Sequence, residues 1–335
     1  MKRALAILVL FVALPGAAPA TTLDVYFIDV EGGQATLIVT PEKETLLIDA
    51  GYGVRFGSRD PDRIMAAVRH AGIDRIDYLL VTHFHNDHVG GVPELATRIP
   101  IGTFIDYGMP LGTDRLTTTA FRNYEPVRAN ARHLVPQPGD RLPLKGIDVD
   151  VVSSGGAVLS KPLSGAGRPT DGCATAEVHP PDGTENYRSV GVLLRYGRFR
   201  FLDLGDLVGR ALVDLVCPRN LVGEVSVYLV SHHGNYDTSL PALYHALRPQ
   251  VVVVNNGPTK GGDAAALSTL GRQKGLDFWQ LHASRNEGAV NADDMFLANV
   301  DDGQSGYWIK LVASKDGSFT VTNSRTGFSR KYSGR

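Results

Sequence analysis

Three of the ten histidines and an aspartate fall within six residues, directly after an apolar run at residues 78–81. A chain that leaves a strand and turns at once can aim His83 and His85 at one point, and Asp87 and His88 at a second. Imidazole and carboxylate ligands suit Zn²⁺, and they also accept Mn²⁺ or Fe²⁺ according to supply and geometry. The alternative is a polar loop that is rich in histidine without binding a metal. We predict a metal centre with all four residues as ligands.

Two further motifs supply what a centre with two divalent ions requires. Asp206 follows Gly205 at the end of a predicted strand, where glycine permits a sharp turn, and its carboxylate suits a bridging ligand. Either His232 or His233, at the end of another strand, completes the second position. Two ions about 3.5–4 Å apart activate a water that attacks an ester-like centre. Asp87 can orient this nucleophile as well as bind metal, so it is the predicted catalytic residue.

The first twenty residues have the pattern of a signal peptide. Lys2 and Arg3 precede an apolar run at residues 4–14, and Ala-Pro-Ala at residues 18–20 resembles a cleavage site. The apolar run is about half of the roughly 20 residues that cross a bilayer. We therefore predict a signal peptide at residues 1–20, a single hydrolase domain at residues 21–335, a secreted or periplasmic location and no membrane span after cleavage.

The charge pattern argues against long-range attraction to nucleic acid. Without Lys2 and Arg3, 32 basic residues remain against 35 acidic ones, and like charges form no block. Arg198 and Arg200 share one face of a predicted strand, which we interpret as a solvated face rather than a phosphate clamp. This balance favours a small-molecule substrate, although it leaves room for a local basic groove.

Cys173 and Cys217 are the only cysteines. Export would place them in an oxidising compartment, where one disulfide can persist. The alternative is two thiols buried separately, because nothing in the sequence shows that the two segments approach each other. The sequence leaves both arrangements open.

The order of apolar runs and breakers predicts two mixed sheets that face each other, with helices outside. A helix is expected from Asp60 as the cap to Gly72 as the stop. A loop rich in Gly, Pro, Ser and Thr is expected at about residues 153–186, as a lid, a binding surface or a disordered segment. Strands are expected at residues 23–29, 35–40, 45–49, 147–152, 189–194, 198–204, 225–230 and 251–254, helices near 239–249 and 264–274, and a hairpin at 307–323.

These motifs together resemble the metallo-β-lactamase superfamily. More narrowly, residues 27–30, the His-His-Gly end and the helix after it resemble the hydrolase domain of DNA-uptake competence proteins and their free-standing secreted relatives. The resemblance implies an α/β fold, an αββα four-layer sandwich with mixed β-sheets, outer helices and the metals at one edge. The matching segments are His83 to His88 with Gly90-Gly91, Leu47-Ile48-Asp49-Ala50-Gly51, Gly205-Asp206 and His232-His233-Gly234; they carry the ligands named above, and Asp49 matches a supporting aspartate.

Two departures from the family pattern bear on the site. Many members have another histidine before the Gly-Asp motif, and the candidates are His133 and His179. Glu185-Asn186 stands closer to that place, as in the competence branch, so Asn186 is a predicted supporting residue and one ion is expected to bind weakly. The other departure is Glu31-Gly32-Gly33-Gln34, where the competence branch usually has Gly-Gln-Gly-Asp, which weakens a role tied to that acidic loop.

The sequence thus predicts a metal-dependent hydrolase that cleaves an ester bond. The substrate is either a lactone, for instance of the acyl-homoserine type, or a phosphodiester. The alternatives are a nuclease or phosphodiesterase acting on nucleic acid, and a metal-binding scaffold without catalysis. β-Lactam hydrolysis and iron redox chemistry rank lower, because the narrower resemblance points away from the former and no flavin partner domain is recognisable for the latter.

Overall fold

The computed structural model describes residues 21–53, 56–110, 114–176, 178, 185–301 and 306–335. The predicted signal peptide and His179 lie outside these residues. Within the described part of the chain, no helix combines the length and the apolar character that crossing a membrane requires.

The first sheet has the strand order β18-β17-β16-β1-β2-β3-β4-β5-β6. Strands β1, β2 and β3 form an antiparallel meander, and β3 to β6 run parallel. Every residue of β2 and β3 is buried, because both faces of the sheet are covered. The strands are β1 (Leu23–Ile28), β2 (Thr36–Val39), β3 (Thr45–Ile48), β4 (Ile76–Leu80), β5 (Ile101–Ile105), β6 (Arg132–Leu134), β16 (Trp308–Ala313), β17 (Phe319–Asn323) and β18 (Ser329–Tyr332).

The second sheet has the order β15-β14-β13-β12-β11-β10-β8-β7, with β9 paired to β8. Strands β11 to β15 are parallel, so their carboxyl ends meet at one edge. The strands are β7 (Arg141–Leu142), β8 (Asp148–Ser154), β9 (Ala157–Val158), β10 (Gly191–Tyr196), β11 (Phe199–Asp203), β12 (Val227–Leu229), β13 (Val251–Val254), β14 (Asp277–His282) and β15 (Leu297–Asn299).

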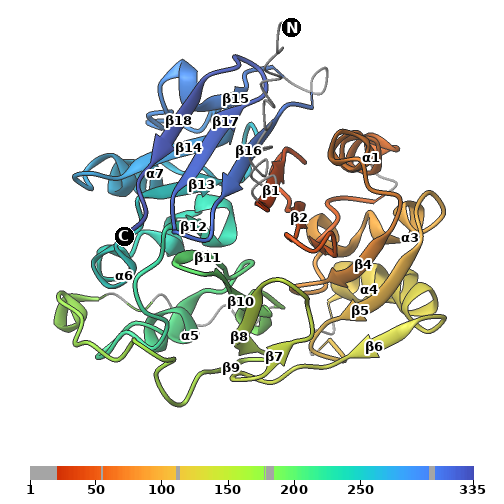
Figure 1. The fold of residues 1–335 in the computed structure, drawn as a ribbon, viewed down its shortest axis with the longest axis horizontal. Helices are drawn as coiled ribbons and strands as arrows, with labels where there is room; N and C mark the ends of the chain where they lie inside the picture. Colours follow the sequence, from red (N-terminus) through yellow and green to blue (C-terminus); the bar gives the residue numbers. More distant parts are fainter. Residues whose placement is uncertain (1–20, 54–55, 111–113, 177, 179–184, 302–305) are drawn as a thin grey trace, which may run out of the picture.

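Helices cover the outer faces of both sheets, and Figure 1 shows α1, α3 and α4 on the opposite side of the molecule from α5 and α6. The α-helices are α1 (Arg59–Ala71), α2 (Asn86–Val89), α3 (Val92–Leu95), α4 (Arg115–Arg128), α5 (Gly209–Asp214), α6 (Pro241–Leu247) and α7 (Ala264–Gly271). Short 3₁₀ helices are η2 (Cys173–Thr175), η3 (Glu185–Arg188), η4 (Ser231–Gly234), η5 (Tyr236–Thr238) and η6 (Asp294–Phe296).

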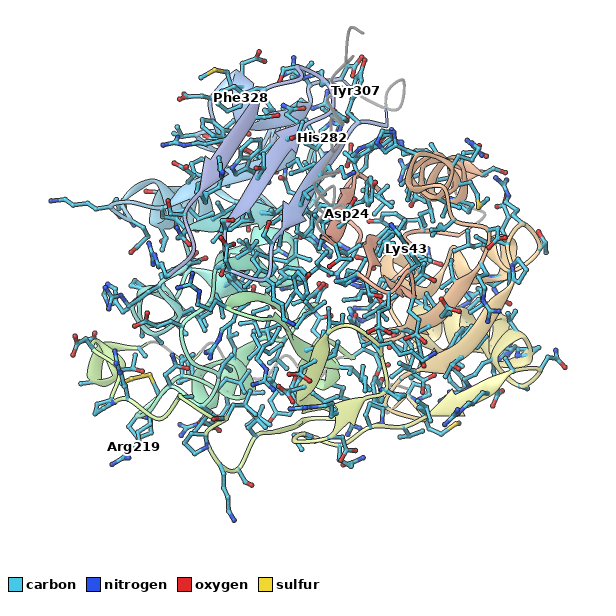
Figure 2. All side chains as sticks on the ribbon, viewed as in Figure 1. Asp24, Lys43, Arg219, His282, Tyr307 and Phe328 are labelled. Carbon is cyan, nitrogen blue, oxygen red and sulfur yellow. A yellow bond between two sulfur atoms is a disulfide. The ribbon has the colours of Figure 1, made fainter. Side chains whose placement is uncertain are left out.

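Two clusters of buried apolar side chains hold these elements together. Between the sheets, Phe27 of β1 meets Phe201 of β11 with ring centroids 5.5 Å apart. Outside the second sheet, Tyr228 packs in a separate cluster with Leu212 of α5 and Leu243 of α6. Figure 2 shows side chains filling the space between the elements. This arrangement confirms the predicted αββα sandwich with mixed sheets.

Two local predictions were wrong. The first helix begins two residues earlier than expected, with Ser58 instead of Asp60 at the capping position, because Asp60 is engaged elsewhere. Its carboxylate accepts hydrogen bonds from the Tyr52 backbone N–H at 2.7 Å and from Arg59 at 2.6 Å. The segment at residues 153–186 is not one long loop in its described part, because β8 extends into it, pairs with β9, and is followed by η2.

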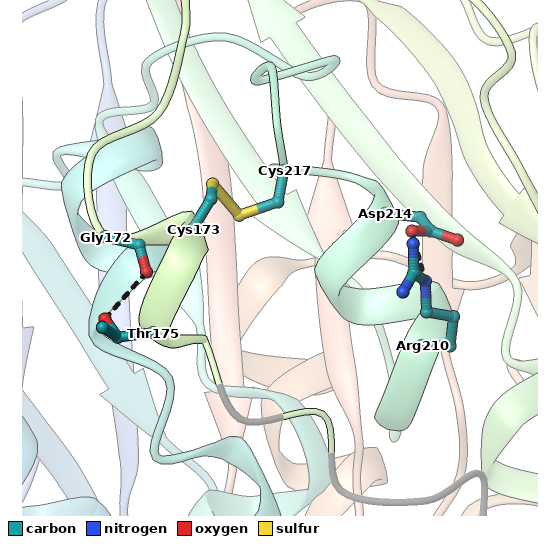
Figure 3. The surroundings of a disulfide bond; sticks show 6 residues. All are labelled: Gly172, Cys173, Thr175, Arg210, Asp214 and Cys217. Carbon is teal, nitrogen blue, oxygen red and sulfur yellow. Dashed lines mark hydrogen bonds and ion pairs between the residues drawn. A yellow bond between two sulfur atoms is a disulfide. The ribbon is translucent and has the colours of Figure 1, made fainter.

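The structure joins Cys173 to Cys217 in a disulfide, which decides between the two arrangements that the sequence left open. Figure 3 shows the bond linking η2 to the segment after α5. The bridge closes a loop with a sequence separation of 44 residues. It therefore fastens the segment after β9 to the outer layer of the second sheet.

Replacing both cysteines by alanine should lower the free energy of unfolding by about 2–4 kcal/mol, because closing a loop of this length restricts the unfolded chain. Denaturant titration of the oxidised protein and of the Cys173→Ala/Cys217→Ala variant measures this difference. Metal affinity should change by less than about twofold, since neither cysteine is in the acidic and histidine cluster described below. An unchanged unfolding midpoint would contradict the prediction.

Candidate metal centre

The loop after β4 places His88 against a fixed carboxylate. Asp49 follows β3 with a positive φ of 60°, and its Oδ2 lies 2.7 Å from His88 Nδ1. The same carboxylate accepts hydrogen bonds from Thr82, from the backbone N–H at 2.8 Å and from the hydroxyl at 2.7 Å. Because Nδ1 of His88 faces an anion, it keeps its proton, and Nε2 is the nitrogen that points to the centre and can offer a lone pair to an ion.

The loop after β11 brings Asp206 to the same place. Gly205 has a φ of 54°, and a Cβ there would lie 2.7 Å from Cβ of Thr82, so only glycine fits. The Asp206 backbone N–H donates to Ser189 Oγ at 3.2 Å. Asp206 Oδ2 consequently lies 3.1 Å from His88 Nε2.

The structure distinguishes His233 from His232. Both residues lie in η4 with a positive φ, 48° for His232 and 56° for His233, so the two rings leave the backbone in different directions. Nε2 of His233 lies 3.2 Å from Asp206 Oδ2 and is buried. His232 instead has Nδ1 2.9 Å from Asp237 Oδ2 and Nε2 3.1 Å from the Asn186 amide nitrogen. Only His233 joins the cluster.

Four buried residues of the described chain, Asp87, His88, Asp206 and His233, each offer a ligand atom within 4.8 Å of the others. Once Nε2 of His88 has lost its proton, their inward atoms are mainly acceptors: Nε2 of His88 and Nε2 of His233 lie 3.3 Å apart, and Asp87 Oδ2 lies 3.3 Å from the latter. Asp206 Oδ1 is buried without a hydrogen-bond partner among the described residues. Converging acceptors need a shared cation, so this donor set fits a divalent ion.

A second position adjoins this cluster. Nε2 of His83 lies 3.0 Å from Nδ1 of His85 and 3.9 Å from Asp206 Oδ2, so Asp206 can serve both positions. Among the described residues, no further imidazole completes this second position. His133 lies 2.9 Å from Asp106 instead, and Asn186 lies against His232.

Burial and charge set the protonation of the metal-free centre. Burial acts to lower the pKa of His88, but Asp206 and Asp49 outweigh it and raise that pKa to about 10. Burial also acts to raise the pKa of Asp206, yet the imidazoles of His233 and His88 hold it well below its usual range. Burial lowers the pKa of His83. One imidazolium therefore stands among the carboxylates until an ion replaces its proton.

Sequence reasoning missed Lys260, whose ammonium contacts Asp87 Oδ2. Burial lowers the pKa of Lys260 to about 7, while the adjacent Asp87 carboxylate favours the charged form. The signal was present in the sequence: Lys260 stands in the run Gly257 to Gly262, directly beyond the buried strand β13, at the edge where the other ligands gather.

Residues 28–158 match the model of the metallo-beta-lactamase superfamily. Over this range the chain is similar to the metallo-β-lactamase superfamily. The matched range contains Asp49 and the whole run from His83 to His88, and it ends before Asp206. The narrower resemblance to competence proteins stays a prediction.

Curated relatives match only about one fifth of this chain. The Atrochrysone carboxyl ACP thioesterase of Aspergillus terreus is 38% identical over 68 residues, which is 20% of each chain. The Lactamase-like protein aptB of Emericella nidulans is 38% identical over 68 residues, 20% of this chain and 21% of that protein. The match thus spans about one fifth of the relatives' length.

Among solved structures, the metallo-beta-lactamase fold protein YhfI from Bacillus subtilis aligns with a TM-score of 0.47 and 11% identity, covering 77% of this chain and 96% of that chain.

The predicted ligands fall into three groups. Asp87, His88, Asp206 and His233 form one cluster, His83 and His85 lie beside it, and His232 turns away. Asp49 lies where a supporting residue should, against His88, whereas Asn186 contacts His232. The ligand and supporting roles themselves stay predictions that metal binding must test.

Replacing His233 by alanine should reduce the bound metal from two ions to one, because its Nε2 is one of four converging donors. His232→Ala provides the matched control, since the neighbouring ring pairs with Asp237 outside the cluster. Elemental analysis after equilibration with Zn²⁺ measures both variants. Loss of metal from the His232 variant alone would show that the assignment is reversed.

Metal affinity should keep rising with pH well above 7. The pKa of His88 is about 10 in the metal-free protein, so an ion that binds Nε2 must displace a proton at any lower pH. One displaced proton corresponds to about a tenfold gain in affinity per pH unit. Competition with a chelator between pH 7 and 9 measures the slope, after correction for the chelator's own titration. A plateau beginning near pH 7 would contradict it.

Proposed function

We propose that this chain is a metal-dependent hydrolase that cleaves an ester bond, either a carboxylic ester such as a lactone or a phosphodiester. The main support is the convergence of four buried residues that can each offer a metal ligand, with the pair His83 and His85 beside them. The four residues are Asp87, His88, Asp206 and His233. The match of residues 28–158 to a superfamily whose members are mostly hydrolases supports the same conclusion.

Two divalent ions, Zn²⁺ in the first instance, would supply a water nucleophile and polarise the oxygen of the ester. The chain's own residues determine where this happens. Asp206 faces His83, His88 and His233, so its carboxylate can link the two positions. Asp87 can bind one ion or hold the proton of the attacking water.

Asp49 keeps the ring of His88 in one orientation, because it accepts the Nδ1 proton and is itself fixed by two hydrogen bonds from Thr82. Burial of these groups excludes bulk water and strengthens their electrostatic effect. This preorganisation supports turnover more than passive metal storage.

Export to an oxidising compartment is part of the proposal. The disulfide between Cys173 and Cys217 supports it, since such bonds persist outside the reducing cytosol. The competence-type resemblance favours phosphodiesters, and the absence of basic runs favours a small substrate. We therefore keep both ester classes until a panel separates them.

The deciding experiment is hydrolysis of lactones, phosphodiesters and β-lactams by the protein from residue 21 onward, loaded with Zn²⁺ or Mn²⁺. Turnover of one ester class should fall at least about a thousandfold in Asp206→Asn, because the linking carboxylate is lost. His245→Ala is the matched control, since this exposed histidine on α6 is not in the cluster.

Lactone turnover would identify a small-molecule esterase, and phosphodiester turnover would support the competence-type resemblance. Stoichiometric metal binding with no turnover of any ester would refute the proposal and leave the metal-binding scaffold as the better account.

A further inference from the structure

Lys260 places its ammonium where a divalent ion is expected. Its ammonium contacts Asp87 Oδ2, and that same oxygen lies 3.4 Å from His88 Nε2 and 3.3 Å from His233 Nε2. The lysine therefore contacts Asp87, one of the four residues that offer a ligand atom in the buried cluster. Lys260 has no assigned role in any of the sequence motifs above.

Contacts on both sides hold the backbone of Lys260 in place. Its carbonyl oxygen accepts from the Gly257 N–H at 2.8 Å, which closes a tight turn. A Cβ on Gly32, in the loop after β1, would lie 2.8 Å from the Cβ of Lys260, so the two loops are in direct contact. On the other side, the Gly262 N–H donates to the His233 carbonyl at 2.8 Å.

Only the flexible stem beyond Cβ can redirect the ammonium. The side chain is 37% exposed, so it has an open side toward solvent, and its Nζ lies 5.6 Å from the centroid of the Tyr52 ring. An aromatic face stabilises a nearby ammonium group. The charge can thus leave Asp87 and still remain next to the centre.

An ion and the ammonium cannot share Asp87 Oδ2 without repulsion. An ion held by Asp87, His88 and His233 would stand next to a like charge in a site that is largely buried, where such repulsion is weakly screened. Binding must therefore break the contact between Lys260 and Asp87, which is a charge-assisted hydrogen bond. The position formed by His83 and His85 carries no such contact among the described residues.

We propose that Lys260 is a positioning residue that competes with the second metal ion for Asp87, so that the position formed by Asp87, His88 and His233 fills only at the higher metal concentration. This inference rests on the proposed function, because it requires a centre for two ions. It makes the metal supply a regulator of the active two-ion state. It also assigns the weaker position to the Asp87 side, whereas the missing third histidine would assign it to the His83 side.

The test is a Zn²⁺ titration of the metal-free protein against a chelator, comparing wild type with Lys260→Met, Lys260→Arg and Lys145→Met. In Lys260→Met the weaker binding step should tighten about tenfold or more, since no internal cation must be displaced, while the tighter step stays within about twofold. Lys260→Arg should retain the weak step because it keeps the charge. Lys145→Met is the matched control, at an exposed ion pair with Glu44.

A purely structural role predicts the opposite sign. If Lys260 only neutralises Asp87 to hold the fold, Lys260→Met should lower the unfolding midpoint and weaken both steps, and that result would overturn the inference. Two further variants assign the weak step: it should disappear in His233→Ala and persist in His83→Ala. The reverse assignment also overturns the inference, while leaving the proposed hydrolase intact.

Failure of the proposed function itself has a different signature. Wild-type protein that binds neither Zn²⁺ nor Mn²⁺ would remove both conclusions together. If the protein binds two ions and turns over an ester, but substitution of Lys260 changes neither metal affinity, only the role of Lys260 is refuted.

Discussion

The centre depends on one buried carboxylate, that of Asp49. It accepts two hydrogen bonds from Thr82 and faces Nδ1 of His88, so it ties the end of β3 to the loop after β4. It also fixes which nitrogen of His88 carries the proton, and with it which lone pair is available for an ion. The positive φ of Asp49 is the local strain that this arrangement requires.

The second constraint is the contact between the two sheets at their carboxyl edge. Asp203, at the end of β11, accepts from the Gln34 side chain at 2.9 Å and from the Gly205 N–H at 3.0 Å. Burial raises the pKa of Asp203 to about 7. The Gln34 N–H in turn donates to the Asp87 carbonyl at 3.1 Å. Because one residue of the loop after β1 contacts both ligand loops, Asp87 and Asp206 are held at a fixed separation although they belong to different sheets.

Sequence patterns predicted the parts of the site that depend on local spacing. The run from His83 to His88 and the Gly205 turn need only a strand end and a few residues, and both lie where expected. The choice between His232 and His233 could not be predicted, since it depends on the left-handed backbone of η4 and on Asp237. The disulfide joins residues that are 44 positions apart in the sequence, and the contact of Lys260 with Asp87 joins residues that are 173 positions apart. Only the folded topology brings each pair together.

The layered fold itself was predictable because alternation and buried runs fix which segments are strands. The exact start of α1 was not, because Asp60, an ordinary capping residue by type, is drawn instead to the Tyr52 N–H and Arg59. The described part of residues 153–186 differs from the expected loop for a similar reason. Its composition favours turns, but pairing of β9 with β8 and the bridge to Cys217 impose order from outside the segment.

Charge balance explains how such a centre can fold before it holds metal. Two carboxylates, Asp87 and Asp206, are buried together, and isolated buried anions would be strongly destabilising. In the metal-free chain, the imidazolium of His88 and the ammonium of Lys260 supply the opposite charge. The large apolar core between the sheets does not depend on an ion either. Metal loading is therefore an exchange of internal cations for external ones, and the affinity of each position reflects the internal cation that it must displace.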